Sequence, residues 1–355
     1  MTTFVIVKTY EKYMLRCIEL AKNGLGTTYP NPLVGSVIVY DGKIIGEGWH
    51  IKSGSPHAEV NAVNSVKDKS LLRKSTLYVS LEPCSHFGKT PPCCDLIIEN
   101  EIPNVVIGTV DPNIKVAGKG IRKLIEAGKK VTVGILEDEC KELNKRFFTF
   151  HEKKRPYVIL KWAESKDGFI APIKIPRKER KPVWITNEFS RQLVHKWRSE
   201  EQAILVGTNT IVDDNPKLDV RDWVGNNPTR IVLDPNNRIP KDSHVFDNQI
   251  KTIIFSKSIS SSTKENIIFE GINFEQNVAQ QILKILYKRQ IQSVIIEGGN
   301  QTLQTFIDEN LWDEARLFIG NKSFESGIKA PIIALKNIEK QSIANDELLI
   351  SRNYD

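Results

Sequence analysis

The sequence predicts an α/β protein made of two layered domains, and three observations support this prediction. The chain has 355 residues, which exceeds the usual size of a single domain. Strand-like apolar runs alternate with helix-like periodic segments along the chain, a pattern typical of layered α/β sheets. The basic stretch His151 to Arg155, just before Pro156, interrupts this alternation, which then restarts. We therefore expect one domain over residues 1–153 and a second over residues 154–355.

The first half alternates helices and strands in a regular order. Helical spacing predicts a helix over residues 10–21 that stops at Gly24. Strands over residues 34–40 and 43–49 flank Asp41-Gly42, which predicts a hairpin with a tight turn. The elements expected after the hairpin are a helix from His57 through Val63, a strand over 76–81, a helix over 94–100, a strand over 104–110, a helix over 120–127, a strand over 131–135 and a charged helix over 137–150.

After Pro156 the same alternation predicts a second α/β domain. Strands are expected over residues 157–162, 203–206, 230–233, 252–255, 293–296 and 314–319, and helices over residues 187–199, 279–287 and 301–309.

The composition, with 40% hydrophobic and 26% charged residues, is that of an ordinary globular protein. The net charge of +7 suggests acidic partners, and because Lys and Arg are spread along the chain, phosphorylated small molecules fit as well as nucleic acid. No apolar run approaches the roughly 18 residues of a membrane helix, and the first ten residues lack the features of a signal peptide. Five cysteines, three of them within residues 84–94, do not suggest a disulfide framework. We expect a cytoplasmic protein without membrane partners.

The stretch from Ser55 to Cys94 contains the parts of a hydrolytic zinc centre. His57 and Glu59 come first, and Cys84 and Cys93 follow. Imidazole and thiolates suit zinc, and three protein ligands leave a fourth position for water, whose pKa zinc lowers to about 7. Glu59 is then the candidate proton shuttle. Because residues two apart do not share a helix face, His57 and Glu59 must converge at the start of a helix.

The spacing of the cysteines leaves alternatives open. H-x-E followed by P-C-x-x-C is the signature of zinc nucleobase deaminases, but here the second cysteine comes nine positions after Cys84. Spacing alone allows either Cys93 or Cys94 as the third ligand, and His86 is near enough to ligate as well. A structural zinc knot is the simpler alternative, although such a site normally has four closed ligands and needs no acid such as Glu59.

The complete motif resembles the deaminase of riboflavin biosynthesis, in which H-A-E is paired with E-P-C-S-H-x-G-x-T-P-P-C. Residues 31–35, 111–113 and 116–120 also look like that family. The resemblance implies a cytidine-deaminase-like fold with α/β/α layers and one zinc ion. It further implies that His57, Cys84 and Cys93 hold the zinc, that Glu59 is catalytic, and that His86 is a substrate neighbour or a support for the ligands.

The second half carries weaker signals when each motif is taken alone. Glu297-Gly298-Gly299 follows a predicted strand and precedes a predicted helix, an arrangement that can hold a phosphate, although such glycines are more often only a turn. Arg198 and Arg221 have the chemistry of a phosphate clamp, but solvated surface arginines are the commoner case. Trp184 before a helix is usually a core residue.

The order of these motifs resembles the reductase of the same pathway, which has a dihydrofolate-reductase-like α/β fold and uses NADPH. The matching pieces are residues 160–168, 184–186 and 206–218, with Arg198, Arg221 and 297–299. The match is weakest over residues 173–181 and at the C-terminus.

The resemblance to the reductase implies two groups of binding residues. NADPH would be held by Ala163, Trp184, Thr210, Asp214, Gly299, Asn300, Gln301, Thr302, Leu303, Gln304 and Thr305. The phosphorylated substrate would be held by Pro182, Arg198, Leu218, Arg221 and Glu297, with Pro182 standing where the family commonly has a small polar residue. Lys161 and Asp214 are expected near the centre of hydride transfer.

These resemblances predict a bifunctional enzyme that removes the 2-amino group of a diaminopyrimidinone ribosylamine 5′-phosphate and then reduces the ribosyl group with NADPH. The expected partner is a small phosphorylated pyrimidine and not nucleic acid, and a homo-oligomer is expected. One alternative is a deaminase of tRNA or free nucleobases with an unrelated or inactive C-terminal domain, which would show base-stacking aromatics and a steep salt dependence. A catalytically inactive zinc module would lack Glu59 or a ligand, and neither is missing.

Overall fold

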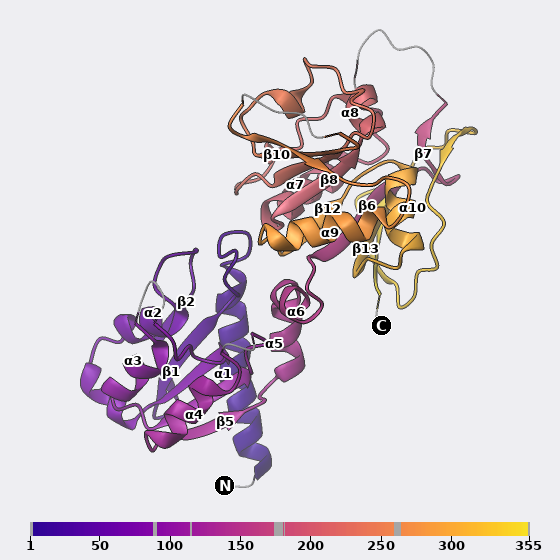
Figure 1. The fold of residues 1–355 in the computed structure, drawn as a ribbon. Helices are drawn as coiled ribbons and strands as arrows, with labels where there is room; N and C mark the ends of the chain where they lie inside the picture. Colours follow the sequence, from indigo (N-terminus) through magenta and orange to yellow (C-terminus); the bar gives the residue numbers. More distant parts are fainter. Residues whose placement is uncertain are drawn as a thin grey trace. The chain divides into compact units, whose positions relative to one another are not determined.

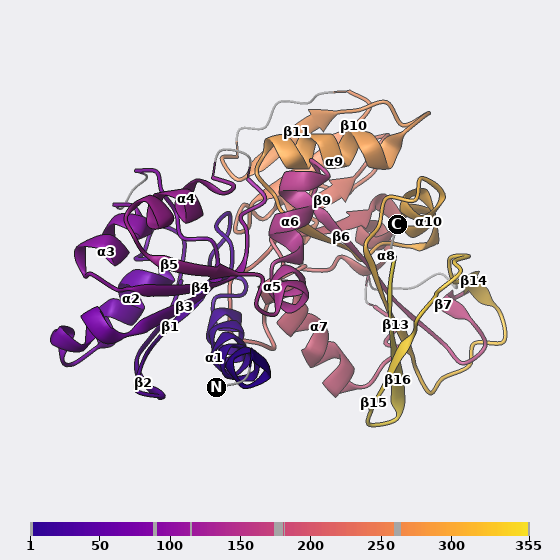
Figure 2. The same ribbon diagram turned by 90° about the horizontal axis from the view of Figure 1, so that it is seen from below.

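The computed structural model describes residues 3–87, 91–113, 116–173, 180, 182–258 and 264–353. The chain separates into two compact units, Met1–Lys154 and Arg155–Asp355, and each unit has its own sheet and its own core (Figures 1 and 2). Within the described parts of the chain, no helix is long and apolar enough to cross a membrane.

The first unit contains a five-stranded sheet in the order β2-β1-β3-β4-β5. β1 is antiparallel to β2 and β3, whereas β4 is parallel to both β3 and β5. Asp41 and Gly42 join β1 to β2 with φ values of 48° and 70°, the left-handed conformation that a two-residue hairpin requires, so the predicted turn is confirmed. The strands are β1 (Gly35–Tyr40), β2 (Lys43–Trp49), β3 (Thr76–Leu81), β4 (Asn104–Thr109) and β5 (Lys130–Val133).

Helices cover both faces of this sheet, which gives the expected α/β/α layers. Successive residues of a strand point to opposite faces, so Val37 and Val39 pack with α1 while Ile38 packs with α2. α5 shares the face of α1, and α3 and α4 share the face of α2. The helices are α1 (Thr3–Lys22), α2 (Ala58–Ser65), α3 (Cys93–Glu99), α4 (Lys119–Glu126), α5 (Glu137–Leu143) and α6 (Lys145–Glu152), with a 3₁₀ turn η1 (Lys69–Lys74).

The prediction of one continuous helix over residues 137–150 is wrong, because the helix is interrupted at Asn144 between α5 and α6. The amide of Asn144 is engaged with a distant loop: its Oδ1 accepts from the N–H of Leu33 at 2.8 Å, and its Nδ2 donates to the carbonyl of Leu33 at 2.9 Å. This pairing satisfies the loop backbone and holds Asn144 outside helical geometry, with φ −103° and ψ 21°.

The second unit contains a nine-stranded sheet in the order β11-β10-β9-β8-β12-β6-β13-β16-β15. The strands from β11 to β13 are parallel, and β16 and β15 are antiparallel additions at one edge. The strands of this sheet are β6 (Tyr157–Glu164), β8 (Ala203–Gly207), β9 (Thr229–Leu233), β10 (Thr252–Ser256), β11 (Ile267–Gly271), β12 (Ser293–Ile296), β13 (Glu314–Ile319), β15 (Glu339–Ile343) and β16 (Asp346–Arg352). A separate ribbon pairs β7 (Phe169–Pro172) with β14 (Gly327–Lys329).

The helices of this unit are α7 (Glu188–Glu200), α8 (Thr208–Asp214), α9 (Val278–Lys288) and α10 (Asn300–Asp308), with a 3₁₀ turn η2 (His244–Phe246). α9 and α10 contribute to the large core on one face of the sheet, and Val194 and Trp197 of α7 pack on the other.

β12 occupies a distinctive place in this sheet. It comes late in the chain, yet it lies between β8 and β6, which come early. The carboxyl ends of β9, β8, β12 and β6 therefore meet along one edge where the order of strands changes direction. Open parallel sheets form ligand crevices at such switch points.

Candidate functional site

The first candidate site lies at the start of α2 and α3. His57 directly precedes α2 with an extended backbone, and Glu59 belongs to the first turn of that helix, as the two-residue spacing predicted. Gly48 of β2 allows α2 to pack closely, since a Cβ at this position would lie only 2.4 Å from the N atom of Ala62 and 2.6 Å from the carbonyl O of Ala58. The glycine therefore sets the position of the helix end that carries both functional side chains.

Three potential metal ligands converge at this helix end. Nδ1 of His57 lies 3.6 Å from Sγ of Cys84 and 3.3 Å from Sγ of Cys93. The ligand atoms of these three residues all lie within 4.8 Å of one another. Cys84 follows β3, and Cys93 opens α3 and donates its backbone N–H to Sγ of Cys84 at 3.3 Å. One imidazole and two sulfur donors at these separations fit a zinc ion.

Cys94 faces a different environment from that of Cys93. Its thiol donates to the carbonyl of Pro83 at 3.4 Å and lies 3.6 Å from the carbonyl of Gly120. Burial raises the pKa of Cys94 to about 12, which disfavours a thiolate. His86 is exposed and does not join the converging ligand atoms. The structure thus brings Cys93, and neither Cys94 nor His86, to His57 and Cys84.

The electrostatics of the cluster suit proton transfer near neutral pH. Hydrogen bonds from the Cys93 thiol and the His57 ring lower the pKa of Cys84 to about 4, despite its burial. Glu59 is only 3% exposed, and this burial, reinforced by the charge of Cys84, raises the pKa of Glu59 to about 7. A carboxyl group with such a pKa can both accept and release a proton at physiological pH.

His50, which was not among the predicted site residues, packs against His57. The two rings meet edge to face with their centroids 5.4 Å apart. The ring nitrogens of His50 lie 3.0 Å from Nδ2 of Asn31 and 3.2 Å from the carbonyl O of Pro56. Burial lowers the pKa of His50, which favours a neutral ring. Asn31 lies in the loop that resembled the deaminase family, and this was the available signal.

Glu82 was also missed, because the Glu-Pro-Cys motif was interpreted only through its cysteine. Its carboxylate is 4% exposed and accepts backbone N–H groups from Gly118 and Gly120, each at 2.9 Å. It also accepts from Asp111 and Ile121, each at 3.3 Å. One side chain therefore ties the segment that leads into α4 to the corner that carries Cys84.

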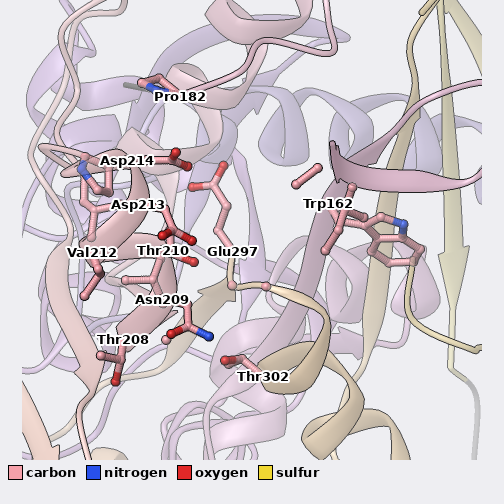
Figure 3. Close-up of a pocket in the computed structure, with 18 of the residues that line it drawn as sticks. Trp162, Pro182, Thr208, Asn209, Thr210, Val212, Asp213, Asp214, Glu297 and Thr302 are labelled. Carbon is pink, nitrogen blue, oxygen red and sulfur yellow. The ribbon is translucent and has the colours of Figure 1, made fainter. Parts of the chain in front are cut away.

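The second candidate site is a cavity of about 1340 Å³ in the second unit, at the carboxyl ends of β6, β8, β9 and β12. Figure 3 shows Asp213 and Asp214 of α8 and Glu297 after β12 reaching into it, with Trp162 of β6 and Thr302 of α10 at its side. The cavity therefore occupies the switch point of the parallel sheet, as expected for a ligand site.

Glu297 joins two cations in this cavity. Its Oε1 lies 2.6 Å from Nζ of Lys161, and its Oε2 lies 2.7 Å from Nη2 of Arg198. Burial alone would raise the pKa of Glu297, but the charges of Arg198 and Lys161 outweigh it and lower this pKa to about 2. The carboxylate is consequently ionised at working pH and fixes the direction of both cations.

Most of the residues predicted for the reductase line this cavity. They are Ala163, Trp184, Thr210, Asp214, Gly299, Asn300, Gln301, Thr302 and Thr305 from the cofactor group, and Pro182, Arg198, Leu218, Arg221 and Glu297 from the substrate group, together with Lys161. Leu303 and Gln304 do not line it: Leu303 is buried in the core, and Gln304 bonds to Asp308 and Ile332. Because α10 turns by about 100° per residue, seven consecutive residues cannot all face one cavity.

Trp184 has the exposure of a ligand contact and not of a core residue. It is 44% exposed in the cavity, and the guanidinium carbon of Arg191 lies 4.9 Å from the centre of its ring. Arg191 also donates to the carbonyl of Thr186 at 2.7 Å, which fixes the guanidinium beneath the indole. The arrangement gives the cavity a flat aromatic surface with a fixed orientation.

Arg238 was not predicted, although it lies in the turn after the predicted strand β9. The buried carboxylate of Asp234 shapes this turn by accepting the N–H groups of Arg238 and Ile239 at 3.0 and 3.1 Å. Nη2 of Arg238 donates to Oδ1 of Asn209 at 2.8 Å. In the described segments, no carboxylate forms an ion pair with Arg238, so its charge is available to a ligand in the cavity.

Comparison with known families matches both halves of the chain. Residues 7–109 match the family described as the cytidine and deoxycytidylate deaminase zinc-binding region, and residues 156–324 match the RibD C-terminal domain. The second match contradicts the alternative in which the C-terminal half is unrelated to the pathway.

Similar proteins cover almost the whole chain. The riboflavin biosynthesis protein RibD of Aquifex aeolicus is 40% identical over 339 residues, which cover 93% of this chain and 92% of that protein. RibD of Escherichia coli K12 is 34% identical, with coverages of 93% and 92%. A Thermotoga maritima structure, described as a diaminohydroxyphosphoribosylaminopyrimidine deaminase and 5-amino-6-(5-phosphoribosylamino)uracil reductase, is 39% identical with a TM-score of 0.87 and covers 98% of this chain and 99% of its own. Acinetobacter baumannii RibD is 33% identical with a TM-score of 0.87, covering 98% and 100%.

Proposed function

Because the chain belongs to the RibD family and is a bifunctional deaminase and reductase of riboflavin biosynthesis, we propose a substrate and a set of residues for each step. Residues 1–153 remove the 2-amino group of 2,5-diamino-6-ribosylamino-4(3H)-pyrimidinone 5′-phosphate. Residues 154–355 then reduce the ribosyl group of the product to a ribityl chain with NADPH. The two activities named for the Thermotoga maritima relative support these substrates.

In the deaminase step, His57, Cys84 and Cys93 hold the zinc ion of this zinc-binding domain. Zinc, when bound, supplies Lewis acidity that makes water reactive near neutral pH. Glu59 takes a proton from the attacking water and delivers it to the amine, which leaves as ammonia when its bond to carbon breaks. The observation that carries this proposal is the buried carboxyl of Glu59, with a pKa of about 7, beside the three converging ligand atoms.

In the reductase step, the cavity residues hold cofactor and substrate side by side. NADPH, when bound, supplies the hydride. The cofactor is held by Ala163, Trp184, Thr210, Asp214 and residues 299–305 at the start of α10. Within that range, Leu303 and Gln304 act through the position of α10 and not by contact with the cofactor. Pro182, Arg198, Leu218, Arg221 and Glu297 hold the substrate, with its phosphate at the arginines. Lys161 and Asp214 lie near the reacting carbon.

The choice of NADPH over NADH is supported by Arg238. The two cofactors differ by the 2′-phosphate on the adenosine ribose, which a guanidinium binds through paired, charge-assisted hydrogen bonds. Arg238 stands at the cavity on the side of α8 and β9, held by Asn209 and without a carboxylate partner in the part of the chain that the structure describes. We therefore assign the cofactor phosphate to Arg238.

The setting of the enzyme follows from the same proposal. We propose a cytoplasmic protein that acts on a small phosphorylated pyrimidine and works as a homo-oligomer, without nucleic acid. The cations around the cavity, such as Arg198, Arg221 and Arg238, and the net charge of +7 suit a phosphorylated substrate and cofactor.

One assay tests both steps in the intact protein by following ammonia release and NADPH oxidation together. The Glu59→Gln variant should release ammonia at least about 100-fold more slowly, because general acid–base catalysis contributes that much. The same variant should oxidise NADPH normally when it is given the deaminated substrate. Undiminished ammonia release would refute the role of Glu59, and wild-type protein that does not oxidise NADPH with the deaminated substrate would refute the reductase proposal.

A further inference from the structure

One face of α7 holds the loop that carries Arg221. His195 and Arg198 are three residues apart and therefore share a side of the helix. Nη1 of Arg198 donates to the carbonyl of Asp219 at 3.3 Å. The backbone N–H of Arg221 donates to Nδ1 of His195 at 3.4 Å. The two helix residues thus bind the backbone of the loop at two points, two residues apart.

The hydrogen bond from Arg221 defines the protonation of the His195 ring. A neutral imidazole that accepts at Nδ1 carries its proton at Nε2. Nε2 of His195 lies 3.1 Å from Oδ2 of Asp222, so the proton faces a carboxylate. The ring is 3% exposed, and burial together with the charges of Arg198 and Arg221 lowers the pKa of His195. The neutral ring is therefore a fixed acceptor on one side and a fixed donor on the other.

The guanidinium of Arg221 has no comparable burial to define its direction. Its side chain is 43% exposed and lines the cavity. Nη1 of Arg221 lies 2.9 Å from Oδ1 of Asp219, and its Nε lies 3.8 Å from Oδ2 of Asp222. His195 touches both the backbone of Arg221 and the carboxylate of Asp222 that flanks its side chain.

We propose that His195 is a positioning residue of the reductase: it holds the 219–222 loop so that Arg221 points at the phosphate of the substrate. This inference rests on the proposed phosphate-binding role of Arg221. His195 is among the residues that line the cavity, but its ring is 3% exposed and both ring nitrogens face partners within the protein, so the role assigned to it is to hold the loop. Its contribution is made before the substrate arrives, by removing alternative directions of the guanidinium.

Three substitutions of His195 in the full-length protein separate positioning from simple packing. His195→Leu keeps an apolar volume but removes both polar contacts. His195→Asn places an amide oxygen near the position of Nδ1 and can still accept from Arg221. His195→Gln places its amide near the position of Nε2 and can contact only Asp222. A residue that merely fills space would be replaced well by leucine.

The expected result is a change in KM and not in kcat. His195→Leu should raise the KM for the deaminated phosphorylated substrate about tenfold, the typical effect of one charge-assisted hydrogen bond. His195→Asn should restore most of this loss, and His195→Gln should not. The kcat, and the Kd for NADPH measured by fluorescence titration, should stay close to wild type. A substrate analogue that lacks the 5′-phosphate should show no difference between wild type and His195→Leu.

A double-mutant cycle with Arg221→Met tests whether His195 acts through Arg221. If it does, His195→Leu should raise KM no further once Arg221 is absent. Fully additive effects, an unchanged KM in His195→Leu, or equal behaviour of the Asn and Leu variants would overturn the inference. An unchanged Kd for NADPH in the same variants serves as the folding control for the second unit, and ammonia release shows that the first unit is intact.

The KM of Arg221→Met distinguishes a failure of the proposed function from a failure of the role of His195. If Arg221→Met alone leaves the KM for the phosphorylated substrate unchanged, the phosphate role of Arg221 is wrong. If Arg221→Met raises KM but His195→Leu does not, the proposed function stands and only the role of His195 falls.

Discussion

Cys93 and Cys94 are adjacent in the sequence, yet they occupy different chemical environments at the start of α3. The Sγ atom of Cys93 faces His57, and that of Cys94 faces the backbone carbonyls of Pro83 and Gly120. Among the residues that the structure describes, only the first environment brings further metal ligands together. A single residue of register in this helix therefore decides which sulfur becomes a ligand.

We predict that Cys93→Ser lowers the zinc content and that Cys94→Ser does not. Cys93→Ser should reduce the zinc content well below one per chain and abolish ammonia release, because serine is a poor zinc ligand. Cys94→Ser should keep the zinc and most of the activity. Elemental analysis after dialysis, alongside an ammonia assay, measures both. Loss of zinc in Cys94→Ser with retention in Cys93→Ser would reverse the assignment.

A second prediction at this scale concerns the choice of cofactor. Arg238→Ala should weaken NADPH binding at least about tenfold, because a charge-assisted phosphate contact is lost, and should leave NADH binding unchanged. Lys217→Ala is the matched control, since Lys217 is another exposed cation of the same cavity. Fluorescence titration with both cofactors gives the ratio of their Kd values. A lower ratio of the Kd for NADH to the Kd for NADPH in Lys217→Ala, and not in Arg238→Ala, would contradict the assignment.

The lowered pKa of Glu297 predicts a pH-dependent contribution to stability. A carboxyl group whose pKa is about 2 in the folded state, against 4.5 for an unperturbed glutamate, stabilises the fold above pH 4.5. That contribution is lost as the pH falls towards 2. The Tm difference between wild type and Glu297→Gln should therefore be largest near neutral pH and shrink below pH 4.5. Calorimetry from pH 7 to pH 3 measures it, and a constant difference across this range would disprove it.

At the scale of elements, Glu82 connects three parts of the deaminase unit. It follows β3, precedes the Cys84 corner, and accepts four backbone N–H groups from the segment that enters α4. Two of these groups, from Gly120 and Ile121, belong to the first turn of α4, where helix N–H groups lack partners within the helix. A buried carboxylate is therefore the cap of α4 and the anchor of the loop before it.

We predict that Glu82→Gln destabilises the first unit by about 1–3 kcal/mol, because the amide nitrogen of glutamine turns a donor towards backbone donors. Calorimetry should show an earlier transition for that unit. Ammonia release should slow as the corner that carries Cys84 loses this anchor, while NADPH oxidation should be unchanged. An unaltered thermal transition would mean that the four hydrogen bonds contribute little.

Local sequence signals predicted the elements that are determined locally. Asp41-Gly42 can occupy left-handed conformations and lies between two apolar runs, residues 37–39 and 44–45, so the β1–β2 hairpin was predictable. The convergence of His57 and Glu59 at a helix start followed from helical geometry alone. The parallel strands of the second unit, such as β12, are buried on both faces and read as continuous apolar runs.

Features that depend on distant partners were not predictable. The break at Asn144 arises from hydrogen bonds to the backbone of Leu33, 111 residues away, and no local sequence pattern near Asn144 predicts it. β15 is an exposed edge strand with a charged sequence, so it lacks the apolar pattern of a strand. Arg238 and His195 became candidates only when folding placed them beside Asn209 and Arg221.

At the scale of the whole molecule, two separately built sites share one chain. The zinc-type cluster lies entirely within Met1–Lys154, and the cavity lies entirely within Arg155–Asp355. Each unit has its own hydrophobic clusters. Chemistry that depends on zinc should therefore be separable from chemistry that depends on NADPH.

We predict that removal of zinc abolishes one activity and spares the other. Protein treated with a chelator should stop releasing ammonia, yet it should still oxidise NADPH when the deaminated substrate is supplied. Added zinc should restore ammonia release, because zinc itself undergoes no redox change when it is removed and replaced. Loss of both activities on chelation would show that the two units depend on each other.

Because β12 comes late in the chain, the second site is completed much later than the first during protein synthesis. His57 and Cys93 are 36 residues apart, whereas Lys161 and Glu297, which meet across the cavity, are 136 residues apart. Ribosomes add about 10 residues per second, so the partner of Lys161 emerges on the order of ten seconds after it. During that interval the deaminase unit has been synthesised in full. The edges of β6 and β8 that will pair with β12 are still unpaired. Chaperones that shield such edges should therefore engage this chain during the synthesis of its second half.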